Sequence, residues 1–360
     1  MQEILTRLGR HSLLRGASLL LTVLIAIYLT VVIANWGGAM DDARRAQIRF
    51  DVTQQIYANP EYFQLPQSEL QRLVDERSEA QIRIEGLDRP FIERSLRYTR
   101  NAITLNLGRS EHIMGDTGSR MVRNILLDRL PSTLLLIATA ELLLFFLALF
   151  GALFLSRRYG SFLDRLTIGL APTSAAPAWF YGLFLILIFA AVLRVLPWGG
   201  MTEAPPPRDT LGYALSLLRH LILPVSAVII GAIFSSIYSW RTFFLMYSSE
   251  DYVELAKAKG LSSRAIERRY ILRPTMPPIL TSFLLMLITM WMGAIVLETV
   301  FNWPGIGRLY YQAIQVYDTP IIVGVVVIFG YLLAVTVFLL DFMYAALDPR
   351  VRLSMGGGRR

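Results

Sequence analysis

The chain has 360 residues, of which 54% are hydrophobic and 17% are charged, and its mean hydropathy is +0.48. This balance lies on the apolar side of soluble globular domains and favours a membrane protein. The sequence contains no cysteine, which excludes disulfides, thiolate metal sites and cysteine nucleophiles. The net charge of +8 occurs without any nucleic-acid-binding motif, so we assign it to contacts with the membrane surface.

Six long apolar stretches follow one another along the chain. Five carry no charged residue and are 19 to 28 residues long, and about 20 residues cross roughly 30 Å of hydrocarbon. The sixth is interrupted only by Glu141, whose insertion cost of about 3 kcal/mol is offset by fifteen Leu, Ile and Phe residues. We predict an all-α polytopic membrane protein. Its transmembrane helices are expected at Gly16–Ala34, Ser132–Ser156, Leu166–Leu193, Leu221–Trp240, Pro274–Leu297 and Thr319–Leu340.

The first apolar stretch follows three arginines, as the core of a secretory signal peptide does. Its 19 residues are long for that role, and Ala34-Asn35-Trp36 lacks the small residues of a cleavage site. We therefore predict that residues 1–35 form a cytoplasmic N-terminal segment and an uncleaved first helix.

The basic residues predict the orientation of the chain. With the N-terminus inside, the inner segments hold 16 Lys and Arg residues and the two short outer loops hold 3. Because Lys and Arg accumulate in short cytoplasmic loops, both termini are expected inside. The inner segments are then residues 1–15, 156–165, 246–276 and 347–360.

Residues 36–131 form a large extracytoplasmic segment between the first two predicted helices. Asp41–Ile56 and Ser68–Arg83 are predicted to be polar helices, the second with a capping box of Ser68 and Gln71 and an apolar face at residues 70, 73 and 74. The apolar content is thin, so we expect this segment to pack against the outer ends of the membrane helices. Residues 132–352 should form a five-helix core, and residues 353–360 a flexible cytoplasmic tail.

Few polar residues fall inside the predicted helices. Glu141 either pairs with a neighbouring helix or lines a polar path, because charges in a membrane are usually turned inward. Glu298 lies near the outer end of the fifth helix, either at the interface or in the path. Met290 belongs to a pliable apolar patch for which ordinary packing is the simpler interpretation. These three residues are the candidates for a pathway or gate.

Other residues have simpler interpretations. Arg241 and Asp341 at inner helix ends are expected to snorkel or pair. His220 is expected at the outer interface. Pro277-Pro278 is expected to start the fifth helix, where a missing backbone donor is harmless.

The sequence contains neither a phosphate-binding loop nor a metal-ligand pattern. Lys257 and Lys259 are its only lysines, and neither lies in a Gly-x4-Gly-Lys-Ser/Thr motif. His11, His112 and His220 lie in different segments. We therefore predict a non-catalytic chain that binds no metal ion and no cofactor of its own.

The polar segment 246–276 separates the fourth and fifth predicted helices. Residues 251–259 favour a helix, Gly260 suits the left-handed turn at its end, and Ser262 or Ser263 can cap a second helix. Such a unit is either a solvated connector or a compact knob that docks on another protein. The residues expected to make the contact are Glu254, Leu255, Ala256, Lys257, Lys259, Gly260, Leu261 and Arg264.

Glu254-Leu255-Ala256, three residues and then Gly260 resemble the E-A-A-x3-G motif in the cytoplasmic coupling loop of binding-protein-dependent ABC importer permeases. Further motifs occur in the order expected for the first permease subunit of the oligopeptide/dipeptide/nickel subfamily, over roughly residues 86 to 352. These motifs are Gly86–Pro90, Leu107–Ser110, Arg129–Thr133, Arg219–Pro224, Glu298–Phe301, Pro304–Arg308 and Leu347–Arg352.

This resemblance implies an inner-membrane permease that carries short peptides. It implies a second permease subunit, two ATPase subunits that bind ATP and Mg²⁺, and an extracytoplasmic substrate-binding protein. Close relatives carry oligosaccharides or nickel chelates, and the apolar helices do not choose among these cargoes. Two alternative functions are an ion-coupled secondary transporter and an intramembrane enzyme. Both would need pairs of polar groups within the helices, and Glu141 is the only charged residue well inside one.

Overall fold

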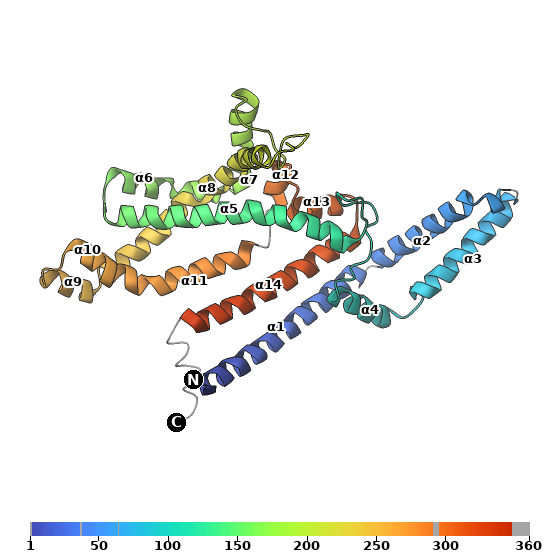
Figure 1. Ribbon diagram of the computed structural model, residues 1–360, viewed down its shortest axis with the longest axis horizontal. Coiled ribbons are helices and arrows are strands. Elements are labelled where there is room, and N and C mark those ends of the chain that lie inside the picture. The colour runs from blue at the N-terminus through green and yellow to red at the C-terminus, as the bar shows by residue number, and fades with distance from the viewer. Residues whose placement is uncertain (1, 37, 64, 291–294, 348–360) are drawn as a thin grey trace. The chain divides into compact units, whose positions relative to one another are not determined.

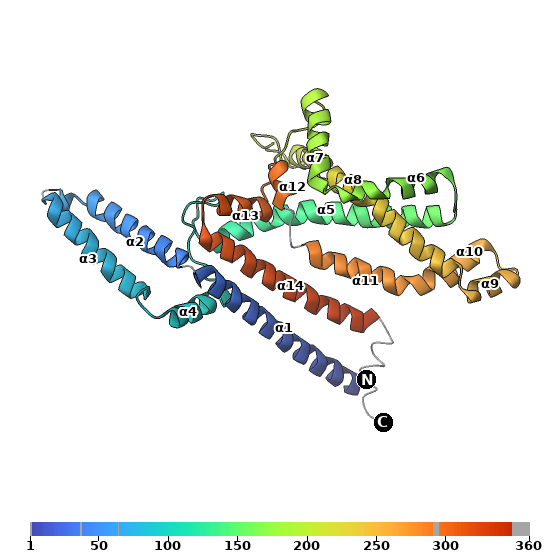
Figure 2. The same cartoon turned by 180° about the vertical axis from the view of Figure 1, so that it is seen from behind.

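The computed structural model describes residues 2–36, 38–63, 65–290 and 295–347 (Figures 1 and 2). Over these residues the secondary structure is helical, and the only β contact is an isolated bridge between Arg109 and Met121. The contacts divide the chain into two compact units. Unit 1 comprises Met1–Asp128 and Gln312–Phe338, and unit 2 comprises Arg129–Tyr311 and Leu339–Arg360.

Unit 1 contains the predicted first and last membrane helices and the predicted outer segment. Its helices are α1 (Gln2–Trp36), α2 (Ala39–Ala58), the 3-10 turn η1 (Pro60–Tyr62), α3 (Gln67–Glu85), α4 (Phe91–Ile103) and most of α14 (Thr319–Leu347). The two predicted polar helices are confirmed as α2 and α3. The capping box is wrong, because α3 begins at Gln67 after Pro66 and no side chain caps it.

The outer segment has a small apolar core of its own. Ile48, Val52 and Ile56 of α2 are buried against Val74 of α3, and Leu70 and Leu73 pack against the same cluster. The shared apolar face predicted for α3 is therefore confirmed.

Within unit 1 this segment also packs on membrane helices, as expected. Ala102 of α4 is buried with Ile27 and Val31 of α1 and with Val323 and Val327 of α14. The loop after α4 is anchored by the buried Asp318, whose Oδ2 accepts from the backbone N–H groups of residues 111 to 113 at 2.9 to 3.2 Å. A carboxylate that accepts several backbone N–H bonds fixes the course of a loop.

Unit 2 contains the remaining membrane helices and the loop of interest. Its elements are α5 (Val122–Ser156, from Arg129), α6 (Phe162–Leu170), η2 (Ala171–Ala175), α7 (Ala178–Leu185), η3 (Ile186–Val192), α8 (Thr210–Ser248), α9 (Asp251–Ala258), α10 (Ser263–Ile266), η4 (Glu267–Leu272), α11 (Arg273–Thr289), α12 (Ile295–Val300) and α13 (Ile306–Gln315, to Tyr311). The main core joins α5, α8 and α12 around the buried Leu136, Leu223, Phe301 and Trp303.

Five helices among the described residues are long and apolar enough to cross a membrane. A sixth crossing results if the bent pair Phe162–Ala175 and Ala178–Val192 is one span. The third predicted helix is thus not one straight helix: its two parts meet at 98°. Pro177 lies at this break, where it removes a backbone donor, and Pro172 lies at the start of η2. The five membrane-crossing helices are Gly16–Ile33, Val122–Ser156, Thr210–Ser248, Ser263–Leu287 and Thr319–Leu340.

Two predictions about helix starts are wrong. Helix α8 begins at Thr210, capped by Asp209 Oδ2, which accepts from the Gly212 N–H at 2.6 Å. His220 therefore lies inside α8, buried, with Nδ1 donating to the Ser216 carbonyl at 2.7 Å. Helix α11 begins at Arg273, so Pro277 and Pro278 lie inside it and do not start it.

Candidate functional site

The polar loop between α8 and α11 folds into a compact element, which we call the coupling knob (residues 251–272). Its first helix, α9, carries Asp251 and Glu254 in the first turn and Lys257 in the last turn. These charges complement the helix dipole at both ends. The helix forms where the sequence predicted it.

Gly260 ends α9 with a left-handed backbone, φ +75°. The Leu261 N–H donates to the Ala256 carbonyl at 3.3 Å and the Gly260 N–H to the Lys257 carbonyl at 2.9 Å. This pair of bonds is the Schellman arrangement of helix ends. Ser262 then caps α10, its Oγ accepting from the Ala265 N–H at 3.4 Å. The glycine turn and the serine cap are confirmed.

The knob has its own apolar core. Val253 and Ala256 of α9 and Ile266 of α10 are buried together, with Leu261 and Tyr270 packed against them. Ala256 is only 2% exposed. In this conformation it holds the knob together and offers no surface to a partner, contrary to the contact predicted for it.

The outward face of α9 is amphipathic. Tyr252 and Leu255, three residues apart on one helix face, are 38% and 57% exposed. Glu254 and Lys257 on the same short helix and Lys259 directly after it are exposed, and Arg264 on α10 is exposed as well. An apolar ridge with charged neighbours is suited to a protein interface and not to catalysis.

One ion pair connects the knob to the rest of unit 2, and a second, buried pair joins α6 to α8. Arg157, just after α5, pairs with Glu267 of the knob. Nearby, Arg241 of α8 and Asp164 of α6 form a buried bidentate pair, with Nη2 donating to Oδ2 at 2.6 Å. Asp164 also accepts from the Gly160 N–H at 2.8 Å. The pairing expected for Arg241 is thus confirmed, whereas the side chain of Asp341 lies outside the described residues.

Glu298 is completely buried in unit 2. Its Oε1 accepts from the Thr133 hydroxyl at 2.9 Å and its Oε2 from the Arg308 N–H at 3.0 Å. The Thr133 oxygen in turn accepts from the Ile306 N–H at 2.7 Å. Glu298 and Thr133 together therefore cap the start of α13. No capping role was predicted for Thr133. The only indication in the sequence was its position in the motif Arg129–Thr133, at the start of a long apolar run.

The other two pathway candidates are not joined to this cluster by hydrogen bonds. Met290 packs against the main apolar core, as ordinary packing predicts. Glu141, partly buried on α5, makes no hydrogen bond or ion pair with any residue that the structure describes. A pathway role for Glu141, Glu298 or Met290 stays a prediction.

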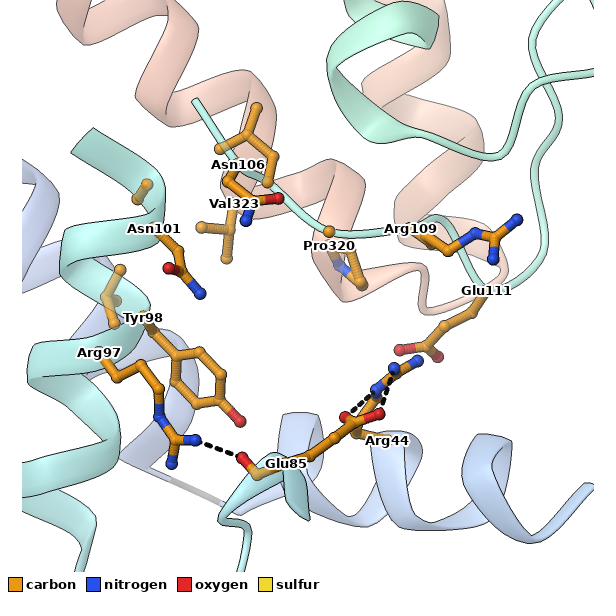
Figure 3. A pocket seen from close by; sticks show the side chains of 14 residues that line it. Arg44, Glu85, Arg97, Tyr98, Asn101, Asn106, Arg109, Glu111, Pro320 and Val323 are labelled. Carbon is orange, nitrogen blue, oxygen red and sulfur yellow. Dashed lines mark hydrogen bonds and ion pairs between the residues drawn. The ribbon is translucent and has the colours of Figure 1, made fainter. Parts of the chain in front are cut away.

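Unit 1 contains a separate cavity of about 350 Å³ (Figure 3). The Tyr98 phenol and the Glu111 carboxylate point into it, and Arg44 on its wall binds Glu85 through two hydrogen bonds of 2.8 Å. Burial, and then the neighbouring Asp318 carboxylate, raise the pKa of Glu111 above its ordinary value. Arg97 and Arg109 also line the cavity, so its wall carries three arginines and two glutamates.

No cluster of three or more His, Cys, Asp or Glu side chains that could hold a metal ion occurs among the described residues. The candidate site consists of the coupling knob, the Arg157–Glu267 pair and the buried Glu298 cluster. Comparison with known proteins identifies the class to which such a chain belongs.

Residues 144–353 match the family described as binding-protein-dependent transport system inner membrane component. The chain belongs to this family. It is 33% identical over 285 residues to the di/tripeptide transport system permease protein DppB of Pseudomonas aeruginosa, covering 74% of this chain and 82% of the relative. It is 30% identical over 253 residues to the oligopeptide transport system permease protein AppB of Bacillus subtilis, covering 66% and 77%.

A third relative, the glutathione transport system permease protein GsiC of Shigella flexneri, is 28% identical over 270 residues, covering 74% of this chain and 81% of the relative. The family match includes the bent helix pair, the coupling knob and Glu298 with α13, whereas Thr133 lies before it. The resemblance inferred from the ordered motifs is thus confirmed, and the chain is a multi-pass membrane permease.

Proposed function

We propose that this permease is one of two membrane subunits of an ATP-driven importer and forms half of a path for short peptides. The observation that carries the proposal is the coupling knob, a packed polar element that follows α8 and continues into the membrane-crossing helix Ser263–Leu287, with an exposed apolar ridge on α9. Tyr252 and Leu255 would be stabilised by burial against a partner, whereas their exposure to water does not stabilise a connector that has no partner.

The partners follow from the family and from this surface. A second, similar permease would complete the path, an ATPase subunit would hold each knob, and an extracytoplasmic binding protein would deliver the substrate. ATP and Mg²⁺ would bind to the ATPase subunits, and this chain would be non-catalytic. The family description, which names dependence on a binding protein, supports this assembly.

Coupling would use the knob as a rigid body. Closure of the ATPases would displace α9, and the Arg157–Glu267 and Asp164–Arg241 pairs would carry the displacement to α5, α6 and α8. Packed elements of this kind change between discrete arrangements and do not deform continuously. The permease would thereby alternate between inward-open and outward-open states.

The substrate assignment rests on the relatives. Their names specify di- and tripeptides, oligopeptides and glutathione, which share an amide backbone and differ in side chains. Short peptides are therefore a better supported cargo than oligosaccharides or nickel chelates. The membrane would be the cell (inner) membrane of a bacterium or archaeon, with both termini in the cytoplasm.

The test is transport by the reconstituted complex in proteoliposomes, with radiolabelled di- and tripeptides delivered by the binding protein. Uptake should require ATP on the side of the ATPases and should persist when ion gradients are collapsed. Vesicles that contain the complex without the binding protein are the control. Uptake that follows a proton or sodium gradient without ATP would contradict the proposal and favour a secondary transporter.

A further inference from the structure

A groove in the membrane part of unit 2 has a chemical character of its own. Its volume is about 460 Å³, and its wall combines residues of α5, α8 and α11, three helices that qualify as membrane-crossing. Four of its eight lining residues are serines, three are aromatic and none is charged. The serines are Ser235, Ser236 and Ser239 of α8 and Ser282 of α11.

The four hydroxyls differ in their hydrogen bonds. Ser235 donates to the Ala232 carbonyl at 3.1 Å and Ser239 to the Ser235 carbonyl at 2.9 Å, both within α8. Ser236 and Ser282 are half-buried and have no hydrogen-bond partner among the residues that the structure describes. Each of these two hydroxyls therefore keeps one donor and its acceptor sites free on the groove.

Such free hydroxyls are not suited to lipid contact. Hydrocarbon offers no hydrogen bond, and a hydroxyl moved from water to an apolar medium without a partner loses stabilisation. A water-filled path, or a neighbouring protein, would provide the missing partners. The groove is open and has a volume of about 460 Å³, far more than one water molecule occupies, which favours a larger occupant.

The aromatic wall is rigid. Phe145 of α5 contacts Trp240 of α8 edge-to-face with ring centroids 6.1 Å apart, and Phe283 of α11 at 5.3 Å. Aromatic faces accept side chains of different shapes without requiring a charge. The groove therefore has hydroxyls that can donate to a carbonyl or accept from an N–H group. It also has an aromatic surface that accommodates side chains of different shapes.

We infer that this groove is a contact site for the backbone of a short peptide in transit, with Ser236 and Ser282 as its hydrogen-bonding residues. The inference rests on the proposed function as a peptide importer. The volume lies in the range of small-molecule sites, roughly 300 to 1,000 Å³. Neutral contacts of this kind bind the backbone at any register and release it again, as a path requires.

The test uses single cysteines, because the chain has none of its own. Ser236→Cys and Ser282→Cys are made in this subunit of the assembled transporter, with partner subunits freed of cysteines. The labelling rate by a small charged thiosulfonate is measured in the absence and presence of a transported peptide. The matched control is Leu285→Cys, a 53% exposed position one turn further along α11.

Ser236→Cys and Ser282→Cys should react about tenfold faster than Leu285→Cys, and saturating peptide should slow their reaction several-fold, about the effect of 1 kcal/mol of competition. Ser236→Ala with Ser282→Ala should raise the transport KM about threefold to tenfold, the effect of losing neutral hydrogen bonds.

Two outcomes overturn the inference. One is that Ser236→Cys and Ser282→Cys are labelled as slowly as Leu285→Cys and that peptide does not change their labelling rate. The other is cross-linking of either cysteine to the second permease through a thiol-attached photo-cross-linker, which would make the groove a subunit interface, since small residues also pack between membrane helices. If the unmodified complex transports no peptide, the proposed function fails; if it transports peptide while the cysteines behave as the control, only the groove assignment fails.

Discussion

At the scale of single residues, the role of Gly260 depends on backbone geometry and that of Thr133 on its hydroxyl group. Gly260 is held at φ +75°, and a Cβ placed there would meet no atom within 4 Å. Any penalty for a larger residue would therefore come from the backbone alone. Thr133 is the opposite case, since its hydroxyl serves as donor and acceptor in a fully packed cluster.

Replacing Gly260 by valine should impair coupling and leave insertion intact. A β-branched residue in the left-handed region costs about 1 to 3 kcal/mol, and 2 kcal/mol lowers occupancy of the docked state about thirtyfold. Peptide-stimulated ATP hydrolysis by the complex should fall by a similar order. Gly330→Val is the matched control, because Gly330 also has open space but lies in a helix without a positive φ. Equal activity of the two variants would show that the turn is not required.

Replacing Thr133 by valine should destabilise unit 2. The variant keeps the volume but removes the hydroxyl that donates to Glu298 and accepts from the Ile306 N–H, so both buried groups lose a partner. Leaving buried polar groups unsatisfied costs about 1 to 3 kcal/mol. The thermal unfolding midpoint in detergent should drop by several degrees. Thr299→Val, which loses only a bond within α12, should change it little.

At the scale of elements, the knob is the part that the sequence predicted best. Its start, its glycine turn and its serine cap follow from local chemistry, because each is determined by neighbours within a few residues. The assignment of surface and core within it could not be predicted. Ala256 and Leu255 are adjacent, and only the packing of α10 back onto α9 decides which of them is buried.

The same limit explains the errors elsewhere. The bend between η2 and α7 divides an apolar run that composition alone presents as continuous. The fourth helix was predicted to start at Leu221 because the charged Arg219 interrupts the apolar run, whereas α8 begins at Thr210. Long-range pairs such as Asp164 with Arg241 join residues 77 positions apart and have no local signal.

The exposed ridge of α9 leads to a prediction about assembly. Leu255→Asp places a charge where an apolar contact is expected, and desolvating that charge at an interface costs binding free energy. Co-purification of the ATPase subunits should fall at least tenfold. Ile84→Asp is the control, since Ile84 on α3 is 76% exposed and lies on the predicted outer side. Retention of the ATPases by Leu255→Asp would argue against docking through this face.

At the scale of the whole molecule, the bent pair decides the topology. If its two parts cross the membrane as one span, the chain crosses six times and the knob lies on the side of the N-terminus. If they form a re-entrant loop, the chain crosses five times and the knob lies on the opposite side. The first arrangement places 16 basic residues inside and 3 in the short outer loops, in agreement with the positive-inside rule.

Accessibility at three positions separates these two arrangements. Single cysteines at Ala80, Pro206 and Gly260, probed in intact cells with an impermeant thiol reagent, should be labelled at Ala80 and Pro206 and protected at Gly260. A re-entrant pair would exchange the last two results, because Pro206 and Gly260 lie on opposite sides of α8. Labelling at Ala80 serves as the internal control, since residues 36–121 follow the first helix in both arrangements. A knob reached from outside would refute the six-span topology and, with it, docking to a cytoplasmic ATPase.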